Sequence, residues 1–169
     1  MVITGEKNHK RLEEIRKNNL RLADPRIINK RVANKIIKGN PGIYWLSYNV
    51  HGNEPSSTEA VMQVAYRLAA GRDKETRKII DNSVVILVPC INPDGRDRYV
   101  YWYKSEQSHV SNTDQNDYEH DEHWPGGRTN HYWFDLNRDL LLGINPESRG
   151  KLGFHHSWYP NITIDFHEM

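Results

Sequence analysis

Two histidines and a glutamate have the residue types and the spacing that could hold a metal ion. His51 and Glu54 are three residues apart, and His167 lies far along the chain. Two neutral imidazoles and one carboxylate form the ligand set of a catalytic zinc site, in which three protein ligands leave a fourth position for water. The sequence therefore predicts a zinc site made by His51, Glu54 and His167.

The elements that must position these residues are predicted from apolar patterning. Apolar runs bounded by Gly, Pro and Asn predict buried strands, and apolar residues at helical spacing predict the helices between them. We expect strands at residues 42–50, 83–88 and 161–166, helices at 6–22, 55–70, 73–82 and 146–159, a turn at 92–95 and a long polar loop at 104–132.

This alternation of strands and helices predicts the fold class α/β, with a mostly parallel mixed sheet sandwiched by helices. In such sheets ligands bind beyond the carboxyl ends of the strands. His51 and Glu54 follow the first predicted strand, the 92–95 turn follows the second, and His167 follows the third. All of them are therefore expected at one edge of the sheet, which strengthens the prediction of a shared site.

Composition limits the remaining classes of function. The 169 residues are enough for one domain, and 23 Lys and Arg nearly balance 22 Asp and Glu, so we expect no nucleic-acid partner. No apolar run approaches the roughly 20 residues of a membrane span, and the lone Cys90 excludes an internal disulfide. Residues 1–4 do not resemble a signal peptide. The compartment is unknown, and a signal on the full-length protein would make it periplasmic or secreted.

Five short motifs carry a resemblance to a known family. They are His-Gly-Asn-Glu-Pro at 51–55, Asn-Pro-Asp-Gly at 92–95, Gly-Arg at 127–128, Asp-Leu-Asn-Arg at 135–138 and Asp-Phe-His at 165–167. In this order they resemble the M14 metallocarboxypeptidases, and the resemblance runs from about Tyr44 to the last residue. The spacing from Gly-Arg to Asn-Arg is similar to that of the carboxypeptidase E/D type.

The resemblance implies a zinc-dependent metallocarboxypeptidase that hydrolyses the C-terminal peptide bond of peptides by a zinc-activated water. A fixed cation would stabilise the oxyanion, and a guanidinium fork would bind the free C-terminal carboxylate of the substrate. The residues that it assigns are the Zn²⁺ ligands His51, Glu54 and His167, the oxyanion-facing Arg128, the carboxylate-binding Asn137 and Arg138, and Asp135, which would orient His51.

Two features of the family have no counterpart in this sequence. The general-base glutamate and the substrate-capping tyrosine lie far downstream in the family. Glu168 is no obvious substitute, because neighbouring residues of a strand face opposite sides and His167 occupies the metal side. We therefore expect residues 1–169 to be a single partial M14-like catalytic domain that lacks its C-terminal part. Alone it is expected to be inactive, with exposed edges that invite self-association.

Two other functions stay open at this stage. The aspartoacylase/succinylglutamate desuccinylase group also carries His-Gly-Asn-Glu and an Asn-Arg pair, and it deacylates small N-acyl amino acids; the long segment between Asn92 and Asp135 favours the peptidase. A non-catalytic zinc- or peptide-binding module is the second alternative. The cluster at residues 119–123 has metal-ligand side chains, but we interpret it as part of a solvated lid.

Overall fold

The structure, a computed structural model, describes residues 1–168 and contains a four-stranded sheet in the order β1-β3-β2-β4. The strands are β1 (Val2–Thr4), β2 (Gly42–Tyr48), β3 (Ser83–Val88) and β4 (Ile162–Phe166). β2 runs parallel to both β3 and β4, whereas β1 pairs with β3 in the antiparallel direction. The predicted α/β class with a mostly parallel mixed sheet is confirmed.

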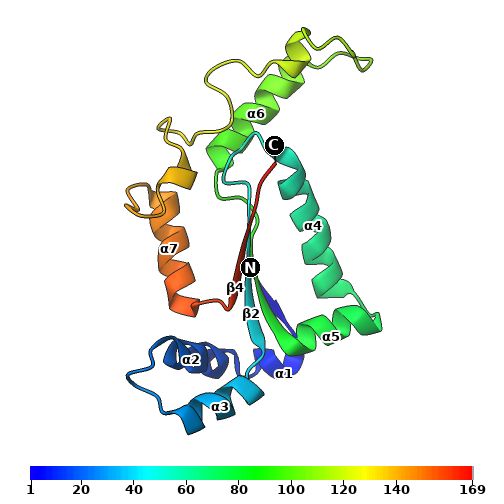
Figure 1. Cartoon of the computed structure of the whole chain (residues 1–169). Helices are drawn as coiled ribbons and strands as arrows, with labels where there is room; N and C mark the ends of the chain where they lie inside the picture. Colours follow the sequence, from blue (N-terminus) through cyan, green and yellow to red (C-terminus); the bar gives the residue numbers. More distant parts are fainter. Residues whose placement is uncertain (169) are drawn as a thin grey trace.

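Helices cover both faces of this sheet. They are α1 (Glu6–His9), α2 (Leu12–Ala23), α3 (Lys30–Gly39), α4 (Pro55–Ala70), α5 (Lys74–Asn82), α6 (Pro93–Glu106) and α7 (Pro146–Trp158), with short 3-10 turns η1 (Tyr118–His120) and η2 (Leu136–Arg138). In Figure 1, α4 and α5 lie on one side of the sheet and α2 and α7 on the other. None of the helices in the described chain has the length and apolar character to cross a membrane.

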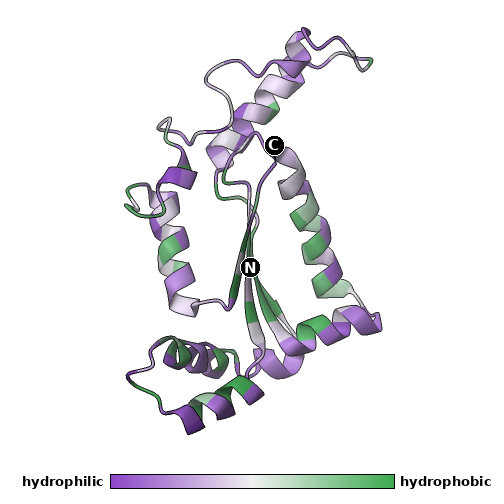
Figure 2. Ribbon diagram, viewed as in Figure 1, coloured by the Kyte–Doolittle hydropathy of each residue, from purple (hydrophilic) through white to green (hydrophobic). Residues whose placement is uncertain are grey.

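Strand alternation divides the core into two layers. Ile43 and Trp45 of β2 are fully buried on the face that packs against α2 and α7, whereas Tyr48 of the same strand packs against α4 on the other face. Figure 2 shows hydrophobic residues on the strands of the sheet and along α4. Because β2 and β3 are buried on both faces, their sequences are nearly continuous apolar runs, as parallel strands require.

The helix predicted at residues 6–22 is divided in two. Arg11 leaves helical geometry between α1 and α2, with φ −124° and ψ 26°. The buried Asn8 explains the break, because its side chain donates to the backbone carbonyls of Ile80 and Asp81 at the end of α5. This contact over more than 70 residues fixes α1 against α5, and no local pattern could have predicted it.

The turn predicted at residues 92–95 is instead the beginning of α6. The Asn92 side chain accepts a hydrogen bond from the backbone N–H of Gly95 (2.9 Å), which makes Asn92 the N-cap of the helix. Gly95 is helical and does not have the positive φ that glycine often supplies in a turn. A Cβ at Gly95 would lie 2.3 Å from the carbonyl oxygen of Gly127, so the close approach of that loop requires glycine.

Other predicted elements are close to the observed ones. α4, α5, α7 and β4 match their predicted ranges within a few residues, whereas α3 was not predicted. The loop expected at 104–132 begins after α6 ends at Glu106, and within it only η1 is regular among the described residues.

Candidate metal centre

The register of β2 and β4 brings the three predicted metal ligands together. Tyr48 and Phe166 are paired neighbours at the ends of these two parallel strands. His51 and Glu54 lie in the loop between β2 and α4, and His167 directly follows β4. One ligand atom from each of the three residues lies within 4.8 Å of the others, so residues more than 110 positions apart form one cluster.

Both imidazoles turn the same ring nitrogen toward the carboxylate of Glu54. Nδ1 of His51 is 2.7 Å from Oε1, and Nδ1 of His167 is 3.2 Å from Oε2. The side chains of His51 and Glu54 are only 4% and 11% exposed, while that of His167 is 34% exposed. The cluster is therefore buried on the α4 side and accessible from the β4 side.

The chemistry of this donor set fits a divalent cation. Nε2 of His51 lies 3.3 Å from the carboxylate of Asp135, which favours the tautomer with its proton on Nε2. Nδ1 then presents a lone pair toward Glu54, whose carboxylate is also an acceptor. With a second imidazole nitrogen on the other side, the cluster offers the N, N and O ligands that suit zinc.

Asp135 is itself held by several donors. As the N-cap of η2 it accepts the backbone N–H of Asn137 (2.9 Å), and its Oδ2 accepts Nε of Arg128 (3.1 Å). Burial alone would raise the pKa of Asp135, but the backbone N–H of Asn137 and the charge of Arg128 bring that pKa below its ordinary value. The carboxylate is thus charged and fixed beside His51.

The predicted substrate-binding residues are only partly brought to the cluster. Arg128 reaches it through Asp135, with the guanidinium 3.0 Å from Oδ2 and about half of the side chain exposed. Asn137 lies beside them on η2. Arg138 is exposed and donates to the carbonyl oxygen of Asn137 (3.2 Å); among the described residues no hydrogen bond joins it to the cluster.

The carboxylate of Glu168 is bound by the first turn of α4 and makes no hydrogen bond to the cluster among the described residues. Its Oε2 accepts the hydroxyl of Ser56 (2.7 Å) and its Oε1 accepts the backbone N–H of Ser57 (3.1 Å). These donors belong to the first turn of α4, which lies beside the C-terminal end of β4 in Figure 1. Glu168 therefore fastens the end of β4 to the helix N-terminus, where a negative charge is favoured.

Asn49 was not among the predicted site residues, although it shapes the loop of residues 49–54 that carries His51 and Glu54. It is fully buried, has a positive φ of 57°, and its side chain donates to the backbone carbonyls of His51 (2.9 Å) and Glu54 (3.1 Å). The available signal was a polar residue between the apolar Tyr48 and Val50. Asn49 folds the loop back so that His51 and Glu54 face each other.

Three backbone segments, around Gly52, Gly95 and Gly127, are in direct contact next to the cluster. The N–H of Gly52 donates to the carbonyl of Gly127 (2.8 Å), and a Cβ at Gly52 would lie 2.0 Å from the backbone of Gly95. Glu122 joins the lid to this junction by accepting from Asn53 (2.7 Å) and from the backbone N–H of Gly127. The glycines of the separate motifs therefore serve one function, the close packing of the loops that carry the site.

The acidic and histidine cluster at residues 119–123 makes hydrogen bonds within the long loop that we expected to be a lid. Glu119 accepts the backbone N–H groups of Ser108 and Asn112 (both 2.9 Å), and His120 bonds the carbonyl of Asn112 (2.7 Å). Within residues 1–168, no group of three metal-ligand side chains other than His51, Glu54 and His167 converges closely enough to hold an ion.

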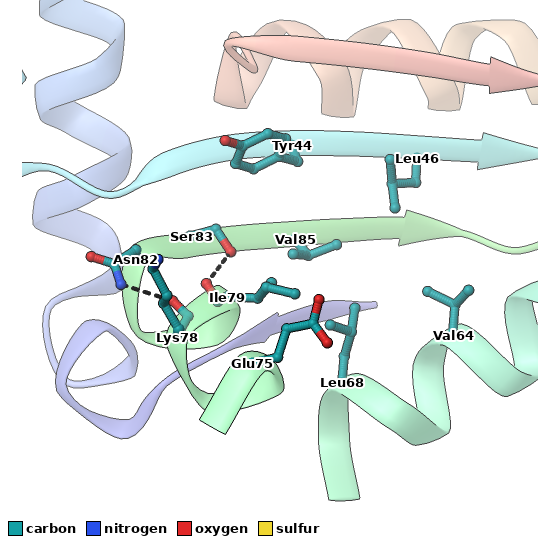
Figure 3. A pocket seen from close by; sticks show the side chains of 10 residues that line it. All are labelled: Tyr44, Leu46, Val64, Leu68, Glu75, Lys78, Ile79, Asn82, Ser83 and Val85. Carbon is teal, nitrogen blue, oxygen red and sulfur yellow. Dashed lines mark hydrogen bonds between the residues drawn. The ribbon is translucent and has the colours of Figure 1, made fainter. Parts of the chain in front are cut away.

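A separate cavity of about 690 Å³ lies between the sheet and helices α4 and α5. Figure 3 shows Tyr44, Leu46 and Val85 of the sheet facing Leu68 and Ile79 across it. Glu75 and Lys78 are among its few charged residues, and no residue of the metal cluster lines it. Its mostly apolar walls offer no comparable ligand set, so the cluster and not this cavity is the candidate functional site.

Known proteins that resemble the chain are carboxypeptidases. Carboxypeptidase 2 of Trichophyton rubrum is 27% identical over 125 residues, which cover 74% of this chain and 18% of that protein. Carboxypeptidase E of Caenorhabditis elegans is 29% identical over 95 residues, which cover 54% of this chain and 17% of that protein. The matched segment thus spans less than a fifth of the length of either relative.

A family match covers most of the chain. The family described as zinc carboxypeptidase, peptidase M14, matches residues 24–169, a range that includes all of the predicted site residues. The chain belongs to the zinc carboxypeptidase family M14.

Proposed function

We propose that this chain carries the zinc-binding half of a metallocarboxypeptidase centre, with His51, Glu54 and His167 as ligands. The supporting observation is that both histidines turn Nδ1 toward Glu54 while Nε2 of His51 faces Asp135. Zinc bound in such a site supplies Lewis acidity, which polarises a carbonyl and acidifies water. Family membership favours this function over the N-acyl amino acid hydrolase alternative.

The substrate class that we propose is a peptide with a free C-terminal carboxylate. The exposed guanidinium of Arg128 is held in place by Asp135 and has further N–H groups for a developing negative charge. Asn137 and Arg138 lie on the next turn, η2, where an amide and a guanidinium can bind a carboxylate together.

Among the described carboxylates near the cluster, none is available as the general base that accepts a proton from water. Asp135 is engaged by Arg128 and Asn137, Asp165 by Ser47 and Lys151, and Glu168 by the first turn of α4. We therefore propose that residues 1–169 alone bind zinc but hydrolyse peptides poorly, and act on their own as a zinc- and peptide-binding unit.

A zinc titration against a coloured chelator tests this proposal. The chain should bind one zinc per molecule, and His51→Ala should weaken binding by more than about 100-fold, because a buried ligand is lost. His156→Ala is the matched control, since it removes an exposed histidine far from the cluster. Unchanged binding in His51→Ala would contradict the site. Rapid hydrolysis of a blocked dipeptide that is lost in Glu168→Gln would contradict the assignment of Glu168.

We also propose that the free edge of β4 supports self-association. The backbone N–H of Asn161 donates inward to Ile43 (2.8 Å), so by strand alternation the backbone groups of Ile162, Ile164 and Phe166 face away from β2. Ile162 and Ile164 are 46% and 41% exposed. An edge with outward backbone groups and exposed apolar side chains is a template for pairing with another chain.

A further inference from the structure

Asp165 stands beside the second histidine of the cluster, in a position to which neither the motifs nor the family match assigns a role. It lies on β4, two residues before His167, so both side chains are on the same face of the strand. Its Oδ2 is 3.5 Å from Nε2 of His167, whereas Nδ1 of that ring faces Glu54. The ring of His167 therefore lies between two carboxylates.

Asp165 is fixed from two directions. Ser47, its register partner on β2, is fully buried and donates its hydroxyl to Oδ1 at 2.6 Å. From α7, the ammonium of Lys151 lies 3.7 Å from Oδ2, and the Lys151 side chain is only 11% exposed. A carboxylate held by a buried hydroxyl and a largely buried cation has little freedom to turn away from His167.

The arrangement resembles the one at His51, although Nε2 of His51 is hydrogen-bonded to Asp135 whereas Nε2 of His167 lies at an ion-pair distance from Asp165. Both histidines direct Nδ1 to Glu54 and Nε2 to an aspartate, at 3.3 Å for Asp135 and 3.5 Å for Asp165. Each aspartate is bound by one neutral donor and one cation. The donors are the backbone N–H of Asn137 and Arg128 for Asp135, and the hydroxyl of Ser47 and Lys151 for Asp165.

We infer that Asp165 is the positioning residue for His167, the counterpart of Asp135 for His51. It holds the proton of His167 on Nε2 and the ring plane toward Glu54, so that Nδ1 is available to a metal ion. This inference rests on the proposed zinc site. The need for such a support is greatest at His167, because its side chain is 34% exposed and follows an edge strand, whereas His51 is enclosed by its loop.

A purely structural role would have a different signature. If Asp165 served only to bind Ser47 of β2 and Lys151 of α7, its removal would lower the stability of the metal-free chain and leave metal affinity unchanged. A positioning role acts on the geometry and basicity of His167, and therefore changes zinc affinity and the visible spectrum of bound Co²⁺.

The experiment compares Asp165→Ala and Asp165→Asn with the control Thr163→Ala, which changes the same face of β4 one pleat farther from the cluster. Zinc affinity is measured by chelator competition, Co²⁺ absorption reports ligand geometry, and thermal unfolding of the metal-free chain reports stability. We expect Asp165→Ala to lose about 10–100-fold in zinc affinity with a shifted Co²⁺ band. Asp165→Asn should lose less, because its amide oxygen can still accept the Nε2 proton, and Thr163→Ala should bind as the wild type does.

The outcomes separate this inference from the proposed function. Wild-type affinity and an unchanged Co²⁺ spectrum in Asp165→Ala, with binding abolished in His51→Ala, would overturn the role of Asp165 and leave the zinc site standing. A wild-type chain that binds no zinc would overturn both.

Discussion

At the scale of single residues, the site depends on side chains that hold other side chains. His51 and Glu54 are oriented by Asn49 from within their own loop, and His51 is also supported by Asp135 from η2. Asn49 tolerates its left-handed backbone because a short polar side chain can bond its own loop. The local geometry of the ligands is therefore built before a metal ion is added.

Replacing Asn49 tests how much this loop contributes. Asn49→Ala loses the two buried hydrogen bonds to His51 and Glu54, and alanine tolerates a φ of 57° less well than asparagine, so we expect a loss of about 2–4 kcal/mol in the free energy of unfolding. Asn49→Gly loses the same bonds without the backbone strain, so its stability should lie between the two. Urea denaturation measures all three chains. An alanine variant as stable as the wild type would contradict this role.

At the scale of secondary structure, the elements bring the site together through register and capping. The paired residues Tyr48 and Phe166 end β2 and β4 side by side, so His51 and His167, which follow them, lie close together. The segment that carries Asp135 is held by a buried polar network around Asp139 and Asn145, which connects η2 to the start of α7. Within this network Asp139 is fully buried and accepts three N–H groups, from Ile144 and from the backbone and side chain of Asn145.

The pH dependence of stability should report this network. Burial would raise the pKa of Asp139, but the N–H groups of Ile144 and Asn145 outweigh it and hold that pKa well below its ordinary range. Since the folded-state pKa is lowered, its stabilisation is present above about pH 4 and is lost as the pH falls further. Asp139→Asn should cost about 1–3 kcal/mol at neutral pH and flatten the acid limb of the stability curve.

Thermal unfolding between pH 3 and pH 7 checks this prediction. Asp121→Asn is the control, because Asp121 is exposed and lies outside the network. A variant of Asp139 with the same acid limb as the wild type would show that the network does not contribute.

The sequence predicted the sheet better than the details of the site. The strands at 42–50 and 83–88 could be predicted because buried parallel strands are short apolar runs. The strand at 161–166 could be predicted from its β-branched pattern although it is an exposed edge strand, and the ends of the first and third strands placed His51 and His167 at one edge. The break at Arg11 and the role of Asp165 could not be predicted from the sequence. Both depend on contacts between distant segments, from Asn8 to α5 and from Ser47 to Asp165, which exist only after the register is set.

At the scale of the whole molecule, the two faces of the sheet are unequally covered near β4. On the α4 side, the paired residues Tyr44 and Ile162, and Leu46 and Ile164, lie on one face, and the isoleucines remain partly exposed. The cavity of Figure 3 begins at Tyr44 and Leu46, so this apolar surface continues toward α5. Such a surface beside an open strand edge explains the proposed self-association.

Sedimentation over a range of protein concentrations tests that proposal. The wild-type chain should show an average mass that rises with concentration, and Ile164→Lys should remain monomeric, because a charge at the edge opposes pairing. Met62→Lys is the matched control, since Met62 is 58% exposed on α4 and away from the strand edge. A monomeric wild type at all concentrations would contradict the proposal.

The central claim is that residues from two strand ends form one zinc site. Its most direct test is a crystal of the zinc-loaded chain with diffraction measured on either side of the zinc absorption edge. We predict one strong anomalous peak, about 2.0–2.2 Å from Nδ1 of His51, Nδ1 of His167 and the Glu54 carboxylate. A peak among the histidines of the lid at residues 119–123, or no peak at the strand ends, would contradict the account.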